Sequence, residues 1–167
     1  MPPDVTEYHQ RITRFQQELQ ALELDGALIT QMVDLYYLSG TAQNCHLFVP
    51  AAGEPLLLAY KNAERARAES AWEQVQTVRS LGEIPIYIKE AGWTDLQHLG
   101  VETDVLTWNM ARRYQKLFPG CKWQDVSKAV RAQRMVKSGY ELGKLRYTAA
   151  KHRQTFQHIG EFVQPGM

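Results

Sequence analysis

The sequence has few cysteines and no long apolar run, and both absences limit what this protein can be. Cys45 and Cys121 are the two cysteines among 167 residues, and neither belongs to a CxxC pair, so no disulfide framework is expected. No stretch of about 18 apolar residues occurs, which argues against a membrane span. Residues 1–5 also lack the basic and apolar regions of a signal peptide. We therefore expect a cytoplasmic protein with no membrane partner.

Motifs that bind phosphates, activate a nucleophile or hold a metal ion are also missing. The 11 glycines form no GxG, no GxxxxGK[ST] and no GxSxG, so a nucleotide-binding turn and a nucleophilic serine elbow are not indicated. The five histidines form no HExxH and no tight set with Cys or Asp. The sequence therefore predicts no catalytic residue, no metal ligand and no cofactor in this chain.

What is present is an alternation of amphipathic helices and short apolar strands. From Tyr8 to Leu22 apolar residues recur every three or four positions, typical of a helix that covers a core. Strands are predicted at 27–30, 46–49, 55–60, 76–79, 99–102 and 121–125, and further helices at 62–72, 107–118 and 128–135, with Ser127 as a cap. The link 50–54 predicts a β-hairpin. Residues 34–40 are expected to be turn-like. Residues 84–88 contain a proline and are expected to form an edge strand or a loop. We expect an α/β fold in which helices flank a mixed β-sheet.

The last part of the chain predicts one long helix with a single apolar stripe. Between Tyr140 and Val163 the spacing of three and four is kept by Leu142, Leu145, Ala149, His152, Phe156, Ile159 and Val163. Such a stripe needs a cover. The helix can fold back on the preceding domain, pair with another chain, or lack a partner that belongs to it. The abrupt ending favours the third.

The charge is unevenly distributed. Residues 1–127 carry 11 Lys and Arg against 16 Asp and Glu, whereas residues 128–167 carry eight against two. The basic residues of this tail include Arg131, Arg134, Lys137, Lys144, Arg146, Lys151 and Arg153. A basic tail can attract nucleic acid, but the polar side of an amphipathic helix explains the same residues. We expect no nucleic-acid partner.

Several segments together resemble the N-terminal domain of the creatinase/prolidase family, the Xaa-Pro dipeptidases and aminopeptidases. The matching segments are 24–30 (LDGALIT), 34–40 (DLYYLSG), 47–58, 101–107 and 130–138 (VRAQRMVKS), followed by the PGM of residues 165–167. The resemblance implies a sheet-and-helix domain with a ribonuclease H-like motif at residues 1–136. It also implies that residues 137–167 are the linker and first helix of a pita-bread catalytic domain that is absent from this chain.

The resemblance further implies a function for the parent protein. Family members hydrolyse peptides ahead of proline with two divalent metal ions (Mn, Co or Zn), whose five ligands would all lie beyond residue 167. This chain alone is then expected to be inactive and to serve homodimerisation and access to the active site. The loop after the YLSG match offers Gln43, Asn44 and His46 as candidate substrate-access residues. Two alternatives remain: the same domain of a creatinase-like C–N hydrolase, or a stand-alone protein-interaction module.

Overall fold

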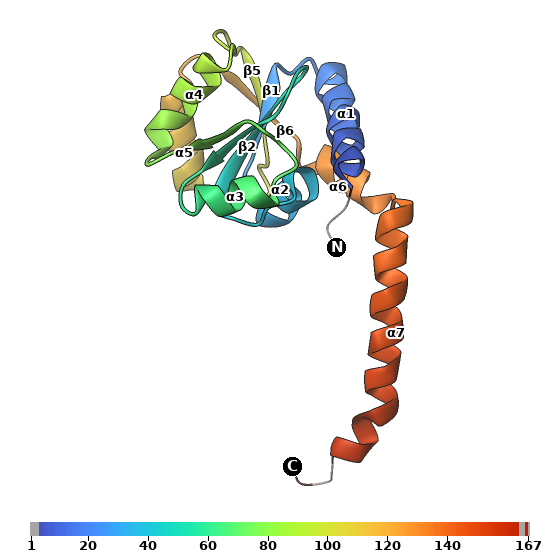
Figure 1. Cartoon of the computed structure of the whole chain (residues 1–167). Helices are drawn as coiled ribbons and strands as arrows, with labels where there is room; N and C mark the ends of the chain where they lie inside the picture. Colours follow the sequence, from blue (N-terminus) through green and yellow to red (C-terminus); the bar gives the residue numbers. More distant parts are fainter. Residues whose placement is uncertain (1–3, 164–165, 167) are drawn as a thin grey trace. The chain divides into compact units, whose positions relative to one another are not determined.

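The computed structural model describes residues 4–163 and 166, and the chain divides into two compact units, residues 1–133 and 134–167 (Figure 1). Each unit is described by itself. Strands β1 to β6 cover Gly26–Ile29, Cys45–Pro50, Leu56–Ala59, Val75–Thr77, His98–Val101 and Lys122–Asp125. Helices α1 to α7 cover Val5–Ala21, Met32–Ser39, Ala63–Glu69, Ile84–Glu90, Trp108–Leu117, Ser127–Met135 and Gly139–Phe162, and a short 3-10 turn, η1, covers Leu81–Glu83.

The first unit is built on one six-stranded mixed sheet with the order β4-β3-β2-β1-β5-β6. The β-hairpin that the sequence predicts is formed by β2 and β3, which run antiparallel with His46 opposite Leu58. β2 also pairs antiparallel with β1, whereas β1, β5 and β6 run parallel to one another, and β4 runs parallel to β3. The expectation of a mixed sheet flanked by helices is confirmed.

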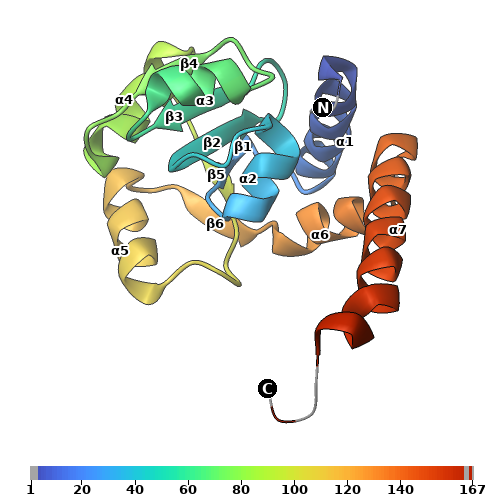
Figure 2. The same cartoon turned by 60° about the horizontal axis from the view of Figure 1, so that its bottom comes forward.

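Successive strand residues point to opposite faces of the sheet and pack into two separate hydrophobic cores, one on each face. Ala27 and Ile29 of β1 point into a core completed by α1, α2, α3 and α6, whereas Leu28 points into a second core completed by α4 and α5. The two helical layers are visible on either side of the sheet (Figures 1 and 2). Strands β1, β2 and β3 are buried along their whole length, which explains why they are continuous apolar runs.

The helix α1 confirms the stripe predicted for it. Asp4 caps its first turn by accepting a hydrogen bond from the Thr6 amide, and the buried side chains follow the predicted spacing: Tyr8, Ile12, Phe15 and Leu19. Arg11 is buried in the same layer. Its guanidinium donates to the Tyr37 carbonyl at 2.8 Å and lies 4.0 Å from the Tyr37 ring centroid. The guanidinium also pairs with the Glu7 carboxylate at 3.0 Å, so a carboxylate, a carbonyl and an aromatic face together stabilise the buried cation.

The segment expected to be turn-like at residues 34–40 is instead the helix α2, and this prediction is wrong. The helix ends at Gly40, whose φ of 87° is the left-handed conformation of a helix C-terminus. Its own N-cap residue, Gln31, makes no side-chain cap. Glu102 instead fixes the two residues just before the helix, because its carboxylate accepts the amides of Thr30 and Gln31. A start signal 71 positions away cannot be read locally.

Residues 84–88, expected as an edge strand or a loop, belong to the helix α4, so this prediction is wrong too. Pro85 lies in the first turn of the helix, where no intrahelical partner for an N–H exists and the fixed φ of proline suits the helix. Ile84 and Ile88, four positions apart, are both buried against the sheet. The proline therefore marks a helix start and does not interrupt a strand.

The cap of α5 is confirmed, whereas that of α6 is replaced by a neighbour. Thr107 accepts a hydrogen bond from the Met110 amide at the start of α5. Ser127 is already the first residue of α6, and its amide donates to the Asp125 carboxylate at 3.1 Å. The same carboxylate oxygen receives the Thr103 amide. Burial alone would raise the pKa of Asp125, but these hydrogen bonds and a further one from the Ser127 hydroxyl lower it to about 2.

The second unit contains α7, which confirms the long helix predicted at the end of the chain. It begins with a capping box, in which Ser138 accepts from the Glu141 amide and the Glu141 carboxylate accepts from the Ser138 amide. Taken by itself, α7 buries none of its side chains. The PGM match lies largely outside the described residues. In the part of the chain that the structure describes, no helix combines the length and the hydropathy needed to span a bilayer.

Candidate functional site

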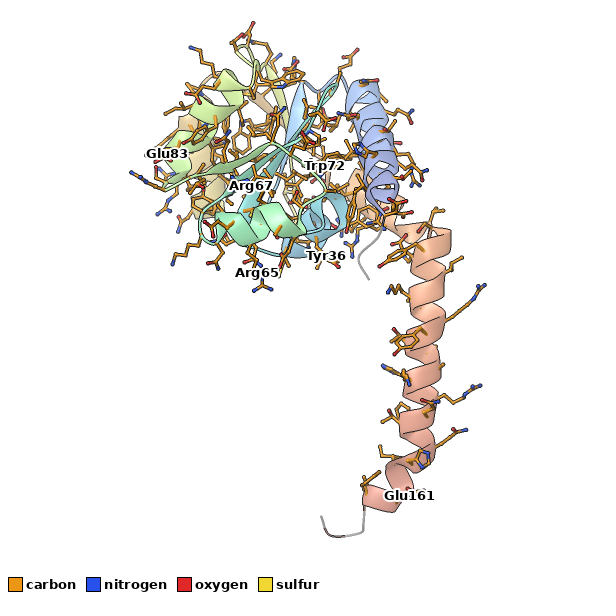
Figure 3. All side chains as sticks on the ribbon, viewed as in Figure 1. Tyr36, Arg65, Arg67, Trp72, Glu83 and Glu161 are labelled. Atoms are coloured by element: carbon orange, nitrogen blue, oxygen red, sulfur yellow. The ribbon has the colours of Figure 1, made fainter. Side chains whose placement is uncertain are left out.

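The loop between α2 and β2 carries two of the three predicted access residues, Gln43 and Asn44, and Glu69 of α3 holds it in place. The Glu69 carboxylate accepts from the Thr41 hydroxyl at 2.8 Å and from the Gln43 side-chain amide at 3.3 Å. It also pairs with Arg65, which projects from the outer side of α3 (Figure 3). The Arg65 and Thr41 hydrogen bonds lower the pKa of Glu69. The loop is thus anchored by a carboxylate that remains ionised at neutral pH.

The three predicted access residues are not brought together. Gln43 is half-buried and turned toward Glu69, whereas Asn44 is exposed and contributes its backbone carbonyl to the Tyr60 amide at 3.1 Å. His46 is the second residue of β2 and is buried, with 6% of its surface exposed. Two of the three can therefore contact a molecule at the surface, and the third lies in the interior.

His46 belongs to a buried group of aromatic side chains. Its Nε2 is hydrogen-bonded to the Tyr114 hydroxyl of α5, with the two ring planes 89° apart. Its ring centroid lies 5.3 Å from that of Tyr60. Burial lowers the pKa of His46 to about 4 and raises that of Tyr114, so both groups are neutral at neutral pH. This pair links β2 to α5 and positions the end of the loop from the inside.

Two buried carboxyl groups, Glu102 and Asp34, also lie in this part of the domain, and neither is indicated as a site residue by the sequence. Glu102 directly follows β5 and is 2% exposed; Asp34 is the third residue of α2 and is 3% exposed. Burial and the neighbouring Asp34 carboxyl raise the pKa of Glu102 to about 7, although the amides of Thr30 and Gln31 act in the opposite direction. An acidic residue directly after a buried strand is the signal that could have identified Glu102.

His46 and Glu102 lie at the same end of the sheet, where β1 and β5 finish and β2 begins, because of the strand register. Ile29 at the end of β1 is opposite Leu47 of β2, and Leu28 is opposite Val101 at the end of β5. His46 and Glu102 are each one position beyond these pairs. They therefore lie at the same end of the sheet as the loop. This end of the sheet combines a polar surface loop with the neutral His46–Tyr114 pair and the buried Glu102 carboxyl group beneath it.

This arrangement contains no constellation for covalent or metal chemistry. Across residues 4–163 and 166, no three His, Cys, Asp or Glu side chains are grouped so that they could hold a metal ion. Cys45 is buried, and burial raises the pKa of its thiol to about 11, which suppresses the thiolate that a nucleophile requires. The described site can position a loop and present it to a partner or a peptide.

Comparison with known proteins assigns the family. Residues 11–136 match the profile of the family described as Creatinase/Prolidase N-terminal domain. The chain belongs to this family. A relative in sequence is an uncharacterised peptidase, YqhT, of Bacillus subtilis (strain 168), with 24% identity over 148 residues, which cover 87% of this chain and 41% of the relative.

Solved structures of family proteins have the same fold. A Xaa-Pro dipeptidase from Bacillus anthracis superimposes with a TM-score of 0.84 at 21% identity, over 96% of this chain and 45% of the dipeptidase. The N-terminal domain of the cytoplasmic peptidase PepQ from Mycobacterium tuberculosis H37Rv gives a TM-score of 0.65 at 22% identity, over 74% of this chain and 98% of that domain. The chain thus spans less than half the length of the peptidases YqhT and Xaa-Pro dipeptidase.

Proposed function

We propose that this chain acts as the N-terminal, non-catalytic domain of a metal-dependent Xaa-Pro dipeptidase or aminopeptidase. The observation that carries the proposal is the similarity to the Xaa-Pro dipeptidase, which includes nearly all of this chain but less than half of that enzyme. The domain would comprise residues 1–136, and residues 137–167 would form the linker and first helix of the catalytic domain. The chain alone would be inactive.

The catalytic chemistry would be supplied by the rest of the parent enzyme. Two divalent metal ions, Mn, Co or Zn, would be held by that catalytic domain, since the described residues of this chain offer no set of ligands. The substrate would be a proline-containing peptide. The description of the PepQ relative as a cytoplasmic peptidase supports a cytoplasmic location.

The contribution of this domain would be homodimerisation and control of access to the active site. The anchored loop after α2 supports the second role, because Gln43 and Asn44 are at its surface while Glu69 and His46 fix its two ends. A loop held on a rigid scaffold can exclude or orient a peptide without adding a reacting group. The apolar stripe of α7 would be covered by the catalytic domain.

A chimera tests the main proposal. Residues 1–167 would replace the matching part of the Bacillus anthracis Xaa-Pro dipeptidase, and hydrolysis of a Xaa-Pro dipeptide and of creatine would be measured with Mn²⁺. The expected result is hydrolysis of the dipeptide by the chimera, none of creatine, and none of either by this chain alone. Stoichiometric Mn²⁺ binding or hydrolysis by the chain alone would contradict a non-catalytic role, as would an inactive chimera whose circular dichroism shows a folded protein.

The access role is tested in the same chimera with Asn44→Ala and Gln43→Ala. Both changes are expected to alter KM for the dipeptide several-fold while leaving metal binding unchanged, since neither residue would touch the metal ions. The matched control is Gln124→Ala, an exposed glutamine on the edge strand β6. Equal KM values for all three variants and the parent chimera would show that the loop has no role in substrate access. Sedimentation of the chimera would report whether it is a dimer.

A further inference from the structure

The exposed apolar side chains of the first unit gather at one end of its sheet. Among the described residues of this unit, seven large apolar side chains are exposed: Val5, Met32, Val33, Tyr36, Ile86, Val105 and Trp108. Five of them belong either to α2, which follows β1, or to the connection from β5 to the first residue of α5. β1 and β5 are parallel neighbours, so both segments start at the same end of the sheet. We call these five side chains, Met32, Val33, Tyr36, Val105 and Trp108, the apolar patch.

The two segments that carry the apolar patch are tied to each other. The Glu102 carboxylate accepts the Thr30 amide at 2.6 Å and the Gln31 amide at 2.8 Å. The residue that follows β5 therefore contacts the two residues that precede α2. The turn after β5 continues from the same glutamate, because its carbonyl accepts the amides of Val105 and Leu106. The first turn of α2 and the turn after β5 thus adjoin at the surface.

The helix α2 is apolar on its outer side as well as on its inner side. Met32, Val33 and Tyr36 are 64%, 51% and 49% exposed, and Tyr36 lies on the outer side of the helix (Figure 3). Leu35 and Leu38 are buried in the core. A helix that is apolar all round is typically covered on every side. The composition of α2 therefore indicates a surface that a partner covers.

This surface also has no exposed charge. Asp34 is the only Asp, Glu, Lys or Arg in residues 30–44, and it is buried; residues 105–111 contain none. Over the whole chain, by contrast, 22% of the residues are charged. Met, Tyr and Trp are enriched in protein–protein interfaces, and charged residues are depleted from their centres. The apolar patch has both properties.

A second copy of this chain fits the apolar patch in charge and in area. A two-fold contact places the same surface on both partners, and a surface without charge does not repel its own copy. With roughly 150–250 Å² for each fully exposed side chain, the patch offers about 500 Å² of apolar surface. One partner of a standard interface contributes about 800 Å², of which about 60% is apolar. The patch therefore supplies the apolar share that one partner needs.

We propose that two copies of this domain associate through the apolar patch. The inference deepens the homodimerisation in the proposed function by naming its surface, and it rests on that function in this respect. Residues 41–44 lie at the same end of the sheet, because β2, which follows them, pairs antiparallel with β1. The contact thereby brings the loop of each copy next to the other copy.

Sedimentation equilibrium of the 167-residue chain tests the contact. Val33→Asp and Trp108→Asp place a charge in the patch, and both are exposed positions in the first turn of a helix, where aspartate is tolerated. Each is expected to raise the dimer dissociation constant by about tenfold or more. Ile86→Asp is the matched control, since Ile86 is 53% exposed in the first turn of α4. It is expected to leave the dissociation constant unchanged.

A further variant separates the patch from the apolar stripe of α7. Phe156 is 68% exposed on that helix, and Phe156→Asp is expected to leave a dimer that Val33→Asp then dissociates. A second measurement uses the unmodified chain alone. On dilution, NMR amide shifts are expected to change at residues 31–36 and 104–109 and to stay constant at residues 84–88.

Several results would overturn the contact. A monomeric chain at NMR concentration would do so, as would a dimer that Val33→Asp leaves intact and Phe156→Asp dissociates. Shifts at the patch that do not change on dissociation would do so without any variant. In the chimera, loss of activity in Val33→Asp with an unchanged dimer would assign the patch to the catalytic domain instead of a second copy.

The contact and the proposed function fail in different ways. A chimera that hydrolyses the dipeptide as a monomer would refute the contact and leave the catalytic assignment standing. An inactive, folded chimera that dimerises through the patch would refute the assignment and support the contact.

Discussion

Burial of His46 makes this domain sensitive to acid, and a single substitution isolates the effect. The imidazole is 6% exposed, and burial lowers its pKa from 6.5 to about 4. The folded protein therefore binds fewer protons at this residue than the unfolded chain does between pH 6.5 and 4. By linkage, the stabilisation is fully present above pH 6.5 and is lost as the pH falls toward 4. His46→Phe keeps a ring in the same place and removes the titrating group.

The magnitude follows from the two pKa values. With 6.5 in the unfolded chain and about 4 in the folded one, the wild type loses about 2 kcal/mol of unfolding free energy by pH 5 and about 3 kcal/mol by pH 4 from this residue alone. Glu102 acts in the opposite direction, because its raised pKa gives a stabilisation that is lost as the pH rises through about 7. Its effect is common to both proteins and cancels in their difference.

Urea unfolding followed by tryptophan fluorescence at pH 7.5, 6, 5 and 4 provides the assay. The wild type is expected to lose about 3 kcal/mol relative to His46→Phe between pH 7.5 and 4. Tyr114→Phe is the control: it is expected to lower stability by about 1–3 kcal/mol at every pH, because the partner of His46 Nε2 is lost. It should keep the acid sensitivity, since burial is the cause of the low pKa. A parallel pH dependence of wild type and His46→Phe would refute the reasoning.

Three further changes test the packing and the termini. Gly100→Ala is expected to destabilise the domain by about 1–3 kcal/mol in urea, because a Cβ there would lie 2.6 Å from the Val126 side chain. Gly82→Ala, where a Cβ would make an ordinary contact of 3.7 Å with Ser80 Oγ, should change stability by less than about 0.5 kcal/mol, and similar losses for both would contradict the overpacking argument. Ser138→Ala removes the capping box and is expected to reduce the helicity of a peptide of residues 137–163 by circular dichroism, an effect of about 1 kcal/mol; unchanged helicity would show that the cap is unimportant. Cys45 is expected to react with a thiol reagent only after urea unfolding, since it is buried with a raised pKa, and prompt labelling of the folded chain would speak against its burial.

Most of the elements could be predicted because their signals are local. The stripe of α1, the apolar runs of β1 to β3 and the hairpin link are properties of neighbouring residues, and the structure keeps all of them. Pro85 was misjudged because a proline has two structural meanings, a helix start or a strand breaker, and only the burial of Ile84 and Ile88 on one side distinguishes them.

The candidate site was less predictable because its parts come from distant segments. Gln43 and Asn44 were indicated by the family resemblance, and the role assigned to them stays a prediction. The support beneath them could not be inferred: Glu69, Tyr114 and Glu102 are 26, 68 and 71 positions from their respective partners Gln43, His46 and Gln31. Polar residues at such separations carry no periodicity that links them.

The sequence by itself determined the helices and strands with strong apolar periodicity, the α/β class and the family, because burial of apolar side chains imposes spacings of two and of three to four residues on the chain. Only the tertiary structure decided that residues 32–39 form a helix and that His46, Asp34 and Glu102 are interior. The physical reason is that a cap, a hydrogen-bond partner and a desolvated charge are defined by proximity in space, which exists only once the sheet has brought its strand ends together.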